Sequence, residues 1–343
     1  MENSKVLCVF HSPCLDGFAS AWIVGHRFGF DNVEFVGVKY GDPVPDMTDR
    51  EVYIVDFSYP PVVLIPAAKT AKSIVVLDHH ETAKQQWKPA STRDGVVLYD
   101  LGDWRDALGY PSEFPLHEPM PSNLRVEFRD DVAGVGTTWD NFFDETTLPL
   151  LLNAIDNGDR WVFDKFERVR DVCEYCRAHG FTRASSANFT KFTKLVESTD
   201  SEDPWGNYHD IADRGAEIAT VYDNLLLEFV PFDNPRLIEF AGYVVPCHAV
   251  PDFFKSSVGD RFGKKYPFSI TYDDNLVPGH RKFSLRSDKN GGVDVEVIAK
   301  RLGGGGHEHA AGFLIPFKYP HHDASVETML EQATVTPISK KSD

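Results

Sequence analysis

Residues 73–83 have the sequence SIVVLDHHETA. The apolar run Ile74–Leu77 is typical of a buried strand, and it leads into an aspartate and two histidines. Taken alone, Asp78, His79 and His80 fit three interpretations: a metal site, a catalytic turn or an ordinary strand end. The remainder of the sequence has to separate these alternatives.

The N-terminal half of the chain alternates between strand-like and helix-like segments. Strands are predicted at 5–11, 33–41, 52–58 and 73–80, and helices at 16–29 and 60–72. This alternation predicts an α/β fold with a doubly wound, mainly parallel sheet. Ligands bind at the carboxyl ends of the strands in such sheets, and His11, Asp56 and Asp78–His80 all fall at predicted strand ends. Three such ends together favour a functional site over isolated turn residues.

The later part of the chain predicts a second domain. Residues 95–123 are rich in Gly, Pro and Asp and predict an irregular insertion, followed by helices from about Thr137 and over 148–163. Residues 185–230 have helical spacing, and the pattern becomes β-rich from Pro235. The predicted parts are a larger N-terminal domain, a helical linker, a smaller α/β C-terminal domain and a polar tail, at 1–190, 191–234, 235–320 and 321–343.

Composition limits the kind of partner. The net charge is −17 over 343 residues, without the basic excess needed to follow the phosphates of long nucleic acid. No apolar run approaches the roughly 18–20 residues of a membrane span, and the N-terminus lacks the order of a secretory signal. Five scattered cysteines do not suggest a disulfide framework. Cys173 and Cys176 form a C-x-x-C without the second pair of a zinc site, so they are predicted to be ordinary helix positions.

Acids and histidines at several strand ends suit divalent cations. Carboxylate and neutral imidazole are ligands for a borderline ion such as Mn²⁺, and a two-metal centre needs several of them from different elements. His11 and Asp16 follow the first strand, and Asp56 follows a later one. Asp156 and Asp159 come after the helical segment LLNAI.

Four segments occur in the order of the four motifs of the DHH phosphoesterases: FHSPCLDGFASA (10–21), VYIVDFS (52–58), VVLDHHETA (75–83) and IDNGDRW (155–161). The segment FSLRSDKNGGVDVEVIAKRLGGGGHEHAAGF (283–313) resembles the glycine-rich signature of the DHH-associated C-terminal domain. The tripeptide alone is a weak signal, whereas both signatures together are specific. This family includes oligoribonucleases of the nanoRNase type and enzymes that cleave cyclic dinucleotides or nucleotide bisphosphates.

The resemblance implies a metal role for four residues. His11 and Asp56 would bind one ion, and Asp16, Asp56 and His79 the other, so that Asp56 bridges the two. Family members often have two aspartates spaced D-x-D in the first motif, but this chain has Cys14 in the place of the first. Cys14 is either a thiolate ligand for a softer metal or, as we expect, a small buried residue that leaves the first metal site weaker.

Further roles follow from the same resemblance. Asp78 would orient the histidines from behind, and His80 would face the scissile phosphate rather than a metal. In the fourth motif either Asp156 or Asp159 could be a metal ligand. The pattern DRW favours Asp159, and Asp156 would then stabilise a neighbouring turn.

The glycine run Gly303–Gly306, followed by His307, has two interpretations. Glycines allow backbone N–H groups to approach a phosphate closely, but they also suit a flexible turn between a helix and a strand. The resemblance favours substrate binding by His307 and by Gly304, Gly305 and Gly306. It also implies that Arg286 offers a planar fork to a terminal phosphate; otherwise Arg286 is a solvated strand residue.

Together with the resemblance, these features imply a Mn²⁺-dependent, exoribonuclease-like phosphodiesterase. It would hydrolyse very short oligonucleotides or linear dinucleotides to mononucleotides by a two-metal mechanism. Alternatives are a cyclic-dinucleotide phosphodiesterase, a nucleotide-bisphosphate phosphatase and a nucleotide-binding protein with weak turnover. We expect two divalent ions, Mn²⁺ first, with Mg²⁺ or Co²⁺ as alternatives. We expect no membrane partner, no long duplex nucleic acid, a cytoplasmic location, and a chain able to form a homodimer.

Overall fold

The computed structural model describes residues 5–93, 96–100, 113–116, 120–143, 146–277 and 279–316. The chain divides into two compact units, Met1–Tyr222 and Asp223–Asp343. Their boundary lies within residues 191–234, the predicted linker, while the division into four parts stays a prediction. The predicted polar tail, 321–343, lies outside the described residues.

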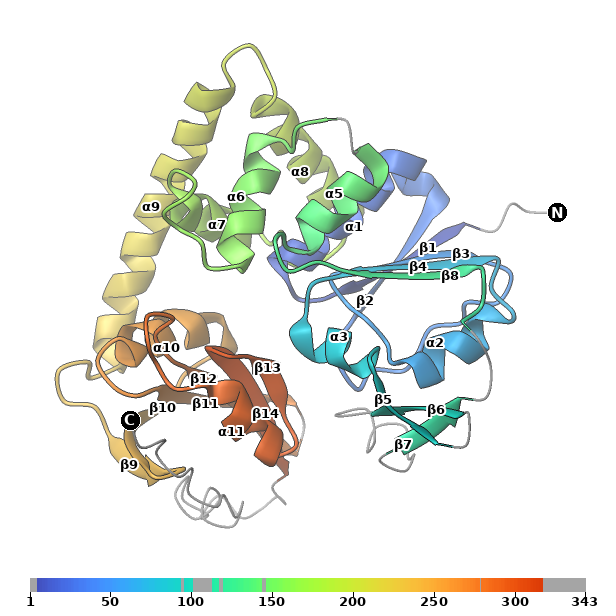
Figure 1. Ribbon diagram of the computed structural model, residues 1–343. Coiled ribbons are helices and arrows are strands. Elements are labelled where there is room, and N and C mark those ends of the chain that lie inside the picture. Colours follow the sequence, from blue (N-terminus) through green and yellow to red (C-terminus); the bar gives the residue numbers. More distant parts are fainter. Residues whose placement is uncertain are drawn as a thin grey trace. The chain divides into compact units, whose positions relative to one another are not determined.

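The first unit is built on a five-stranded, fully parallel sheet with the strand order β2-β1-β3-β4-β8 (Figure 1). Its strands are β1 (Val6–His11), β2 (Val33–Val38), β3 (Glu51–Val55), β4 (Ser73–Asp78) and β8 (Leu124–Phe128). Four of these strands lie where the alternation of apolar runs predicts them. The sequence analysis missed β8, which begins just after the predicted insertion.

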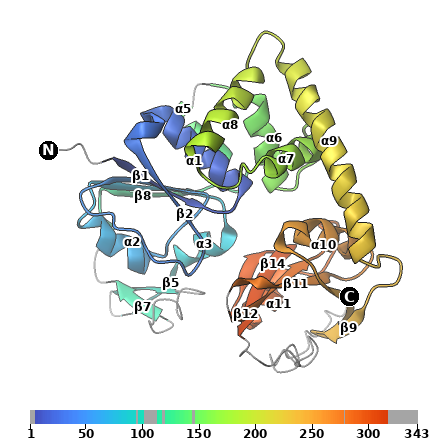
Figure 2. The ribbon, with the colours of Figure 1, turned by 180° about the vertical axis from the view of Figure 1, so that it is seen from behind.

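Helices cover both faces of this sheet. The views of Figures 1 and 2 agree that α1 and α5 lie on one face and α2 and α3 on the other. Successive residues of β1 accordingly enter opposite cores, Cys8 and Phe10 into one, Leu7 and Val9 into the other, as expected for a strand buried on both sides. The predicted doubly wound sheet is confirmed. The helices are α1 (Leu15–Phe28), α2 (Pro61–Ala68), α3 (Glu81–Gln86), α5 (Gly134–Phe143), α6 (Leu150–Asp159) and the short 3₁₀ helix η1 (Phe30–Asn32).

The helix α1 is almost entirely enclosed. Every residue from Leu15 to Gly25 is buried, because the helix packs on β1 and also contacts α5 and α6. A helix in this position has to be apolar all round. Asp16, in the first turn of this helix, is therefore a buried acid beside the end of β1.

The prediction of an irregular insertion at 95–123 is wrong for residues 96–100 and 113–116, which are strands. Three strands form a small antiparallel sheet in the order β5-β6-β7. They are β5 (Pro89–Arg93), β6 (Val96–Asp100) and β7 (Glu113–Leu116). Each strand has only four or five residues, and the surrounding Gly, Pro and Asp residues dominate the local composition.

Three helices follow, and the last of them continues across the boundary between the two units. They are α7 (Val169–Ala178), α8 (Ser186–Ser198) and α9 (Pro204–Phe229). Cys173 and Cys176 are buried free thiols on α7, so their prediction as ordinary helix positions is confirmed. Within the part of the chain that the structure describes, no helix combines the length and apolar character needed to cross a membrane.

The second unit is a six-stranded mixed sheet in the order β13-β14-β12-β11-β10-β9, with β10 and β11 parallel and the other pairs antiparallel. Phe283 and Leu285 of β12 pack into a core with Val295 and Ile298 of α11. Their neighbour Arg286 points to the other face, against α10. The elements are β9 (Leu237–Phe240), β10 (Tyr243–Ala249), η2 (Asp252–Phe254), α10 (Lys255–Gly263), β11 (Ser269–Val277), β12 (His280–Arg286), α11 (Val295–Arg301), β13 (Gly305–His307) and β14 (Ala310–Pro316). The predicted smaller α/β part is confirmed.

Candidate metal centre

The strands β1, β3 and β4 are neighbours and run parallel, so their carboxyl ends lie at the same edge of the sheet. His11 is the last residue of β1, and Asp56 comes directly after β3. Asp78 ends β4, with His79 and His80 next. The sheet order therefore brings together the three strand ends that the sequence singled out.

Asp56 lies at the middle of this edge. Its backbone has a φ of 52°, a left-handed conformation that aspartate adopts more readily than most residues. The carboxylate is 1% exposed; its Oδ1 is 3.2 Å from His79 Nε2 and its Oδ2 is 3.5 Å from His11 Nδ1. Burial would raise the pKa of Asp56, but the neighbouring His11, His79 and His80 lower it well below its usual range. Oδ2 is buried without a hydrogen-bond partner.

Three carboxylates converge on a single nitrogen of His79. Its Nε2 lies 3.2 Å from Asp56 Oδ1, 3.3 Å from Asp159 Oδ2 and 3.5 Å from Asp16 Oδ2. Burial would lower the pKa of His79, but the hydrogen bond to Asp56 and the nearby Asp159 and Asp16 raise it well above its usual value. Burial and the other two acids likewise raise the pKa of Asp16. The cluster therefore carries a surplus of negative charge that only a cation or a bound proton can offset.

Asp16 is held by the first turn of α5. Its Oδ2 accepts a hydrogen bond from the Gly134 N–H at 2.8 Å, and its Oδ1 accepts one from the Val135 N–H at 2.7 Å. A Cβ at Gly134 would lie 2.7 Å from Asp56 Cβ and 2.8 Å from Asp16 Oδ2. Only glycine allows this approach of α5. Sequence reasoning missed Gly134, because nothing local in GVGTT connects it with a residue 118 positions earlier.

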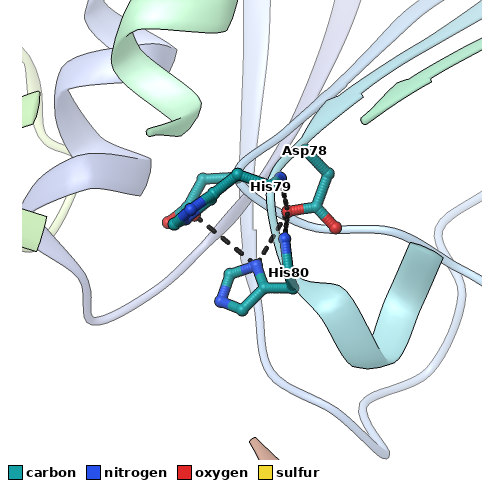
Figure 3. Close-up of side chains that lie close together, drawn as sticks. Asp78, His79 and His80 are labelled. Atoms are coloured by element: carbon teal, nitrogen blue, oxygen red, sulfur yellow. Dashed lines mark hydrogen bonds and ion pairs between the residues drawn. The ribbon is translucent and has the colours of Figure 1, made fainter. Parts of the chain in front are cut away.

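Asp78 and His80 pair directly, as Figure 3 shows, and His80 Nδ1 also lies 3.8 Å from Asp56 Oδ1. Asp78 is fully buried, and its Oδ1 accepts from His80 Nδ1 at 2.7 Å and from the His79 backbone N–H at 2.8 Å. Burial would lower the pKa of His80, but Asp78 raises it above its usual value. Asp78 thus fixes the ring of His80 through its side chain and the position of His79 through its backbone.

Cys14 lies next to the cluster, at the residue that precedes α1. Its Sγ, a His11 ring nitrogen and an Asp56 carboxylate oxygen lie within 4.8 Å of one another. Burial, with the charges of Asp56 and Asp159, raises the pKa of the Cys14 thiol well above its usual range. Cys14 is partly buried, whereas the other four cysteines are buried.

Of the two candidate acids in the fourth motif, the structure places Asp159 in the cluster and Asp156 outside it. Asp156 Oδ1 accepts from the Ala133 N–H at 2.7 Å, and its Oδ2 accepts from Arg160 Nε at 3.2 Å. These contacts tie the end of α6 to the loop before α5. Asp159 instead points one turn further round α6, towards His79.

The donor set fits divalent cations. Three groups of ligand atoms have mutual distances within 4.8 Å: Asp16, His79 and Asp159; His11, Cys14 and Asp56; and Asp56, Asp78, His79 and His80. Atoms bound to one ion at about 2.0–2.2 Å lie about 3.0–3.5 Å apart, which is the spacing between His79 Nε2 and its three carboxylates. The buried, unpartnered Asp56 Oδ2 is the atom for which a cation would supply the missing partner.

The second unit contains the other candidate residues. The Arg286 guanidinium donates from Nη1 to the Leu285 carbonyl at 2.9 Å and from Nη2 to Ser256 Oγ at 3.3 Å. Its Nε is buried without a hydrogen-bond partner, and burial lowers its pKa to about 10. Arg286 is thus packed beneath α10 and is not the solvated strand residue of the alternative interpretation.

Two lysines extend this positive region, and the sequence analysis did not single them out. Lys255 and Lys282 both donate to Asp252 Oδ1, at 2.9 and 3.1 Å. Burial, with the charges of Lys282 and Arg286, lowers the pKa of Lys255 to about 8 despite Asp252. The sequence KFSLR of β12 could have indicated this region, because side chains alternate along a strand and Lys282 and Arg286 therefore share one face.

The backbone conformation and close packing of residues 303–306 explain why glycines occur there. Gly303 and Gly306 have φ values of 74° and 144°, and a Cβ at Gly304 would lie 2.1 Å from the Gly312 carbonyl oxygen. Gly305 of β13 pairs with Gly312 of β14, and His307 is an exposed residue at the end of β13. The run thus forms a close-packed strand start, and its role in substrate binding stays a prediction.

No family model matches the chain. A curated relative, an uncharacterized protein of Acanthamoeba polyphaga mimivirus, is 26% identical over 322 residues. The match covers 89% of this chain and 66% of the relative, so the chain spans slightly less than two thirds of that relative's length.

Several solved structures resemble the chain at low identity. RecJ from Thermus thermophilus in complex with Mn²⁺ has a TM-score of 0.46 and 13% identity, with 96% of this chain and 52% of RecJ covered. The pGpG-specific phosphodiesterase PggH from Vibrio cholerae has a TM-score of 0.43 and 13% identity, covering 96% and 99%. The DHH domain of a member of the s1p family of ribosomal proteins has a TM-score of 0.49 and 13% identity, covering 96% and 86%. The chain is similar to these proteins, and its resemblance to the DHH phosphoesterases rests on its own motifs and on the parallel sheet that carries them.

Proposed function

We propose that this protein is a divalent-metal-dependent phosphoesterase that hydrolyses very short oligonucleotides or linear dinucleotides to mononucleotides. One observation carries the proposal. Carboxylates from three separate elements converge on His79 Nε2, while Asp56, which is among them, keeps a buried oxygen without a partner. Such a cluster is costly to bury unless a cation completes it.

The proposed metal ligands divide between two ions. Asp16, His79 and Asp159 would hold one, His11 would hold the other, and Asp56 would contact both. The oxygen-rich first set suits Mn²⁺, with Mg²⁺ or Co²⁺ as alternatives. When bound, such ions act as Lewis acids toward a phosphoryl group and offset the charge that develops on it.

His80 has a different proposed role. Asp78 holds its Nδ1, so the ring keeps one orientation and its Nε2 lies on the far side from Asp78. With Asp78 accepting at Nδ1, a protonated ring can donate from Nε2 to a phosphoryl oxygen or to a leaving oxygen. A charge-assisted bond of this kind is roughly twice as strong as a neutral one.

The second unit would bind the rest of the substrate. Arg286, with Lys255 and Lys282, offers cations on one face of the sheet, and phosphate is the anion that such a group recognises best. Gly304, Gly305, Gly306 and His307 are proposed to approach the substrate as well. The net charge of −17 makes long duplex nucleic acid an unsuitable partner. The five free thiols suit a reducing compartment, and on that ground we propose a cytoplasmic location; a homodimer is proposed without a defined interface.

A substrate panel tests this proposal. Labelled RNAs and DNAs of two to five nucleotides, cyclic dinucleotides and nucleotide bisphosphates are incubated with the full chain and Mn²⁺. Release of mononucleotides from the short linear substrates is expected, and chelation should abolish it. Faster turnover of cyclic dinucleotides or of bisphosphates would show that the proposed substrate class is wrong, while metal-dependent phosphoester hydrolysis would stand. Tight binding of nucleotides without any product would establish a binding protein instead.

A further inference from the structure

The site around His11 differs chemically from the site around Asp159. The Asp16–His79–Asp159 group offers two carboxylates and one imidazole. The His11–Cys14–Asp56 group offers an imidazole, a thiol and a carboxylate, and its three ligand atoms lie within 4.8 Å of one another. Sulfur in one group and only oxygen and nitrogen in the other predict unlike metal preferences.

Cys14 has no evident structural task for its sulfur. The backbone N–H of Cys14 donates to the Thr182 carbonyl at 3.2 Å, and its own carbonyl accepts from the Phe18 N–H at 3.1 Å. The residue that precedes a helix usually caps it with a side-chain oxygen, but Cys14 makes no side-chain cap. The backbone is therefore fixed on both sides while the thiol points to the edge of the cluster.

A second observation points independently to a ligand at this place. Asp56 is 1% exposed, and its Oδ2 is buried without a hydrogen-bond partner. That atom is 3.5 Å from His11 Nδ1, close to the spacing of two donors on one ion. The carboxylate thus has an unfilled coordination position on the side of His11 and Cys14, opposite the oxygen that faces His79.

We propose that Cys14 Sγ, as a thiolate, binds a metal ion together with His11 Nδ1 and Asp56 Oδ2, and that this site prefers a softer ion such as Zn²⁺ or Co²⁺ to Mn²⁺. This inference rests on the proposed metal centre. Binding breaks the S–H bond, forms an S–metal bond and releases the thiol proton to solvent. The neighbouring Asp16–His79–Asp159 group keeps its preference for a hard ion, so the centre holds two ions of different kinds.

Cobalt absorption tests the sulfur ligand directly. The metal-free full chain is titrated with Co²⁺, and a thiolate-to-cobalt charge-transfer band in the near ultraviolet is expected. Cys14→Ser should remove the band while Co²⁺ still binds to the oxygen-rich group. The matched control is Cys176→Ala, which removes a buried thiol from α7 and should leave the band unchanged. A wild-type protein that binds Co²⁺ without the band, or a band that survives in Cys14→Ser, overturns the proposal.

A second variant tests the preference itself. Cys14→Asp supplies the acid that the family motif usually has. We expect the ratio of Zn²⁺ affinity to Mn²⁺ affinity to fall by at least the roughly 10–100-fold that loss of an outer-shell partner costs. An unchanged ratio shows that the sulfur does not bind metal.

Thiol protection needs no variant, so it is decisive even if both substitutions prevent folding. Cys14 is partly buried, and the other four thiols are buried, so Cys14 is the cysteine whose alkylation a bound ion should change. Alkylation of Cys14, followed by peptide mass spectrometry, should be slowed by stoichiometric Zn²⁺ and not by Mg²⁺. Equal alkylation with and without Zn²⁺ overturns the proposal. Hydrolysis without these sulfur signatures refutes this inference alone, whereas sulfur signatures without hydrolysis of any substrate refute the proposed function alone.

Discussion

The carboxyl edge of the first sheet gathers acidic side chains around one imidazole, whereas the α10 face of the second sheet gathers three basic side chains. At the first, three carboxylates surround one nitrogen of His79. At the second, Lys255 and Lys282 share the single carboxylate of Asp252, and Arg286 lies close enough to lower the pKa of Lys255. One region is complementary to cations and the other to anions.

Both regions also bury polar atoms that have no hydrogen-bond partner. Asp56 Oδ2 and Asp78 Oδ2 are such atoms in the first region, and Arg286 Nε and Thr271 Oγ1 in the second. Leaving a buried polar atom unpaired costs about 1–3 kcal/mol, and a ligand that supplies the partner removes this cost. Under the proposed function, the first region would bind the metal ions and the second a phosphate group.

Substitution of Asp56 should have the largest effect. Asp56→Ala is expected to remove bound metal and to lower kcat/KM by about 10³-fold or more, equivalent to about 4 kcal/mol of transition-state stabilisation. Metal content by mass spectrometry and hydrolysis rates measure both effects. Asp130→Asn, which removes an exposed acid paired with Lys84, should change neither. Full activity of Asp56→Ala would remove the first region from the mechanism.

Substitution of His80 should separate chemistry from metal binding. His80→Ala is expected to lower kcat by about 10²–10⁴-fold, the usual range for a proton donor, with metal content unchanged. Asp78→Asn should lower kcat less, because it disturbs only the orientation of the His80 ring. Loss of metal in His80→Ala would assign His80 to the ligands and merge the two roles.

Substitutions on the α10 face should raise KM and leave the metal content unchanged. Arg286→Ala and Lys282→Ala are each expected to raise KM by about 10–100-fold, since a hydrogen bond to a charged group contributes about 1.5–3 kcal/mol. Arg281→Ala is the matched control, because Arg281 on the same strand is paired with Asp274. Metal loss in Arg286→Ala would contradict the assignment of metal binding to the first region and phosphate binding to the second.

The two regions should also respond to pH in opposite directions. Protons occupy the metal-free cluster because the pKa values of His79 and Asp16 are raised. Metal binding has to displace these protons, so the apparent Mn²⁺ affinity should fall with decreasing pH, by up to about tenfold per pH unit for each proton. Lys255 loses its charge above its pKa of about 8, so inorganic phosphate binding to the metal-free protein should weaken as pH rises through that value. Calorimetry over a pH series measures both affinities, and slopes of the same sign would contradict the opposite charges proposed for the two regions.

The sequence predicted most of the metal edge because its signals are local. Three apolar, strand-like runs end at His11, Asp56 and Asp78. Neighbouring parallel strands place their carboxyl ends at the same edge of a sheet. The sequence did not predict β8 or the β5-β6-β7 sheet, whose strands are short and lie among Gly, Pro and Asp residues. It favoured Asp159 over Asp156 only through the family pattern, because two acids three positions apart near a helix end are separated only by the contacts around them.

Other features depend on contacts between distant segments. Gly134 matters because α5 approaches Asp16 and Asp56, and no pattern around Gly134 shows this. Lys255 and Lys282 become one positive region only when α10 is folded onto β12. The glycine run shows the reverse case, since its conspicuous sequence is explained largely by φ values and by close packing on β14.

The contact between Asp16 and α5 has a consequence for the motion of the protein. Both oxygens of Asp16 accept backbone N–H groups at the start of α5, so a cation that orders Asp16 also ties down that helix end. The amide hydrogens of Gly134 and Val135 should then exchange with solvent more slowly when the centre is loaded. Hydrogen–deuterium exchange at these two amides would report metal occupancy from a helix that supplies no ligand of its own.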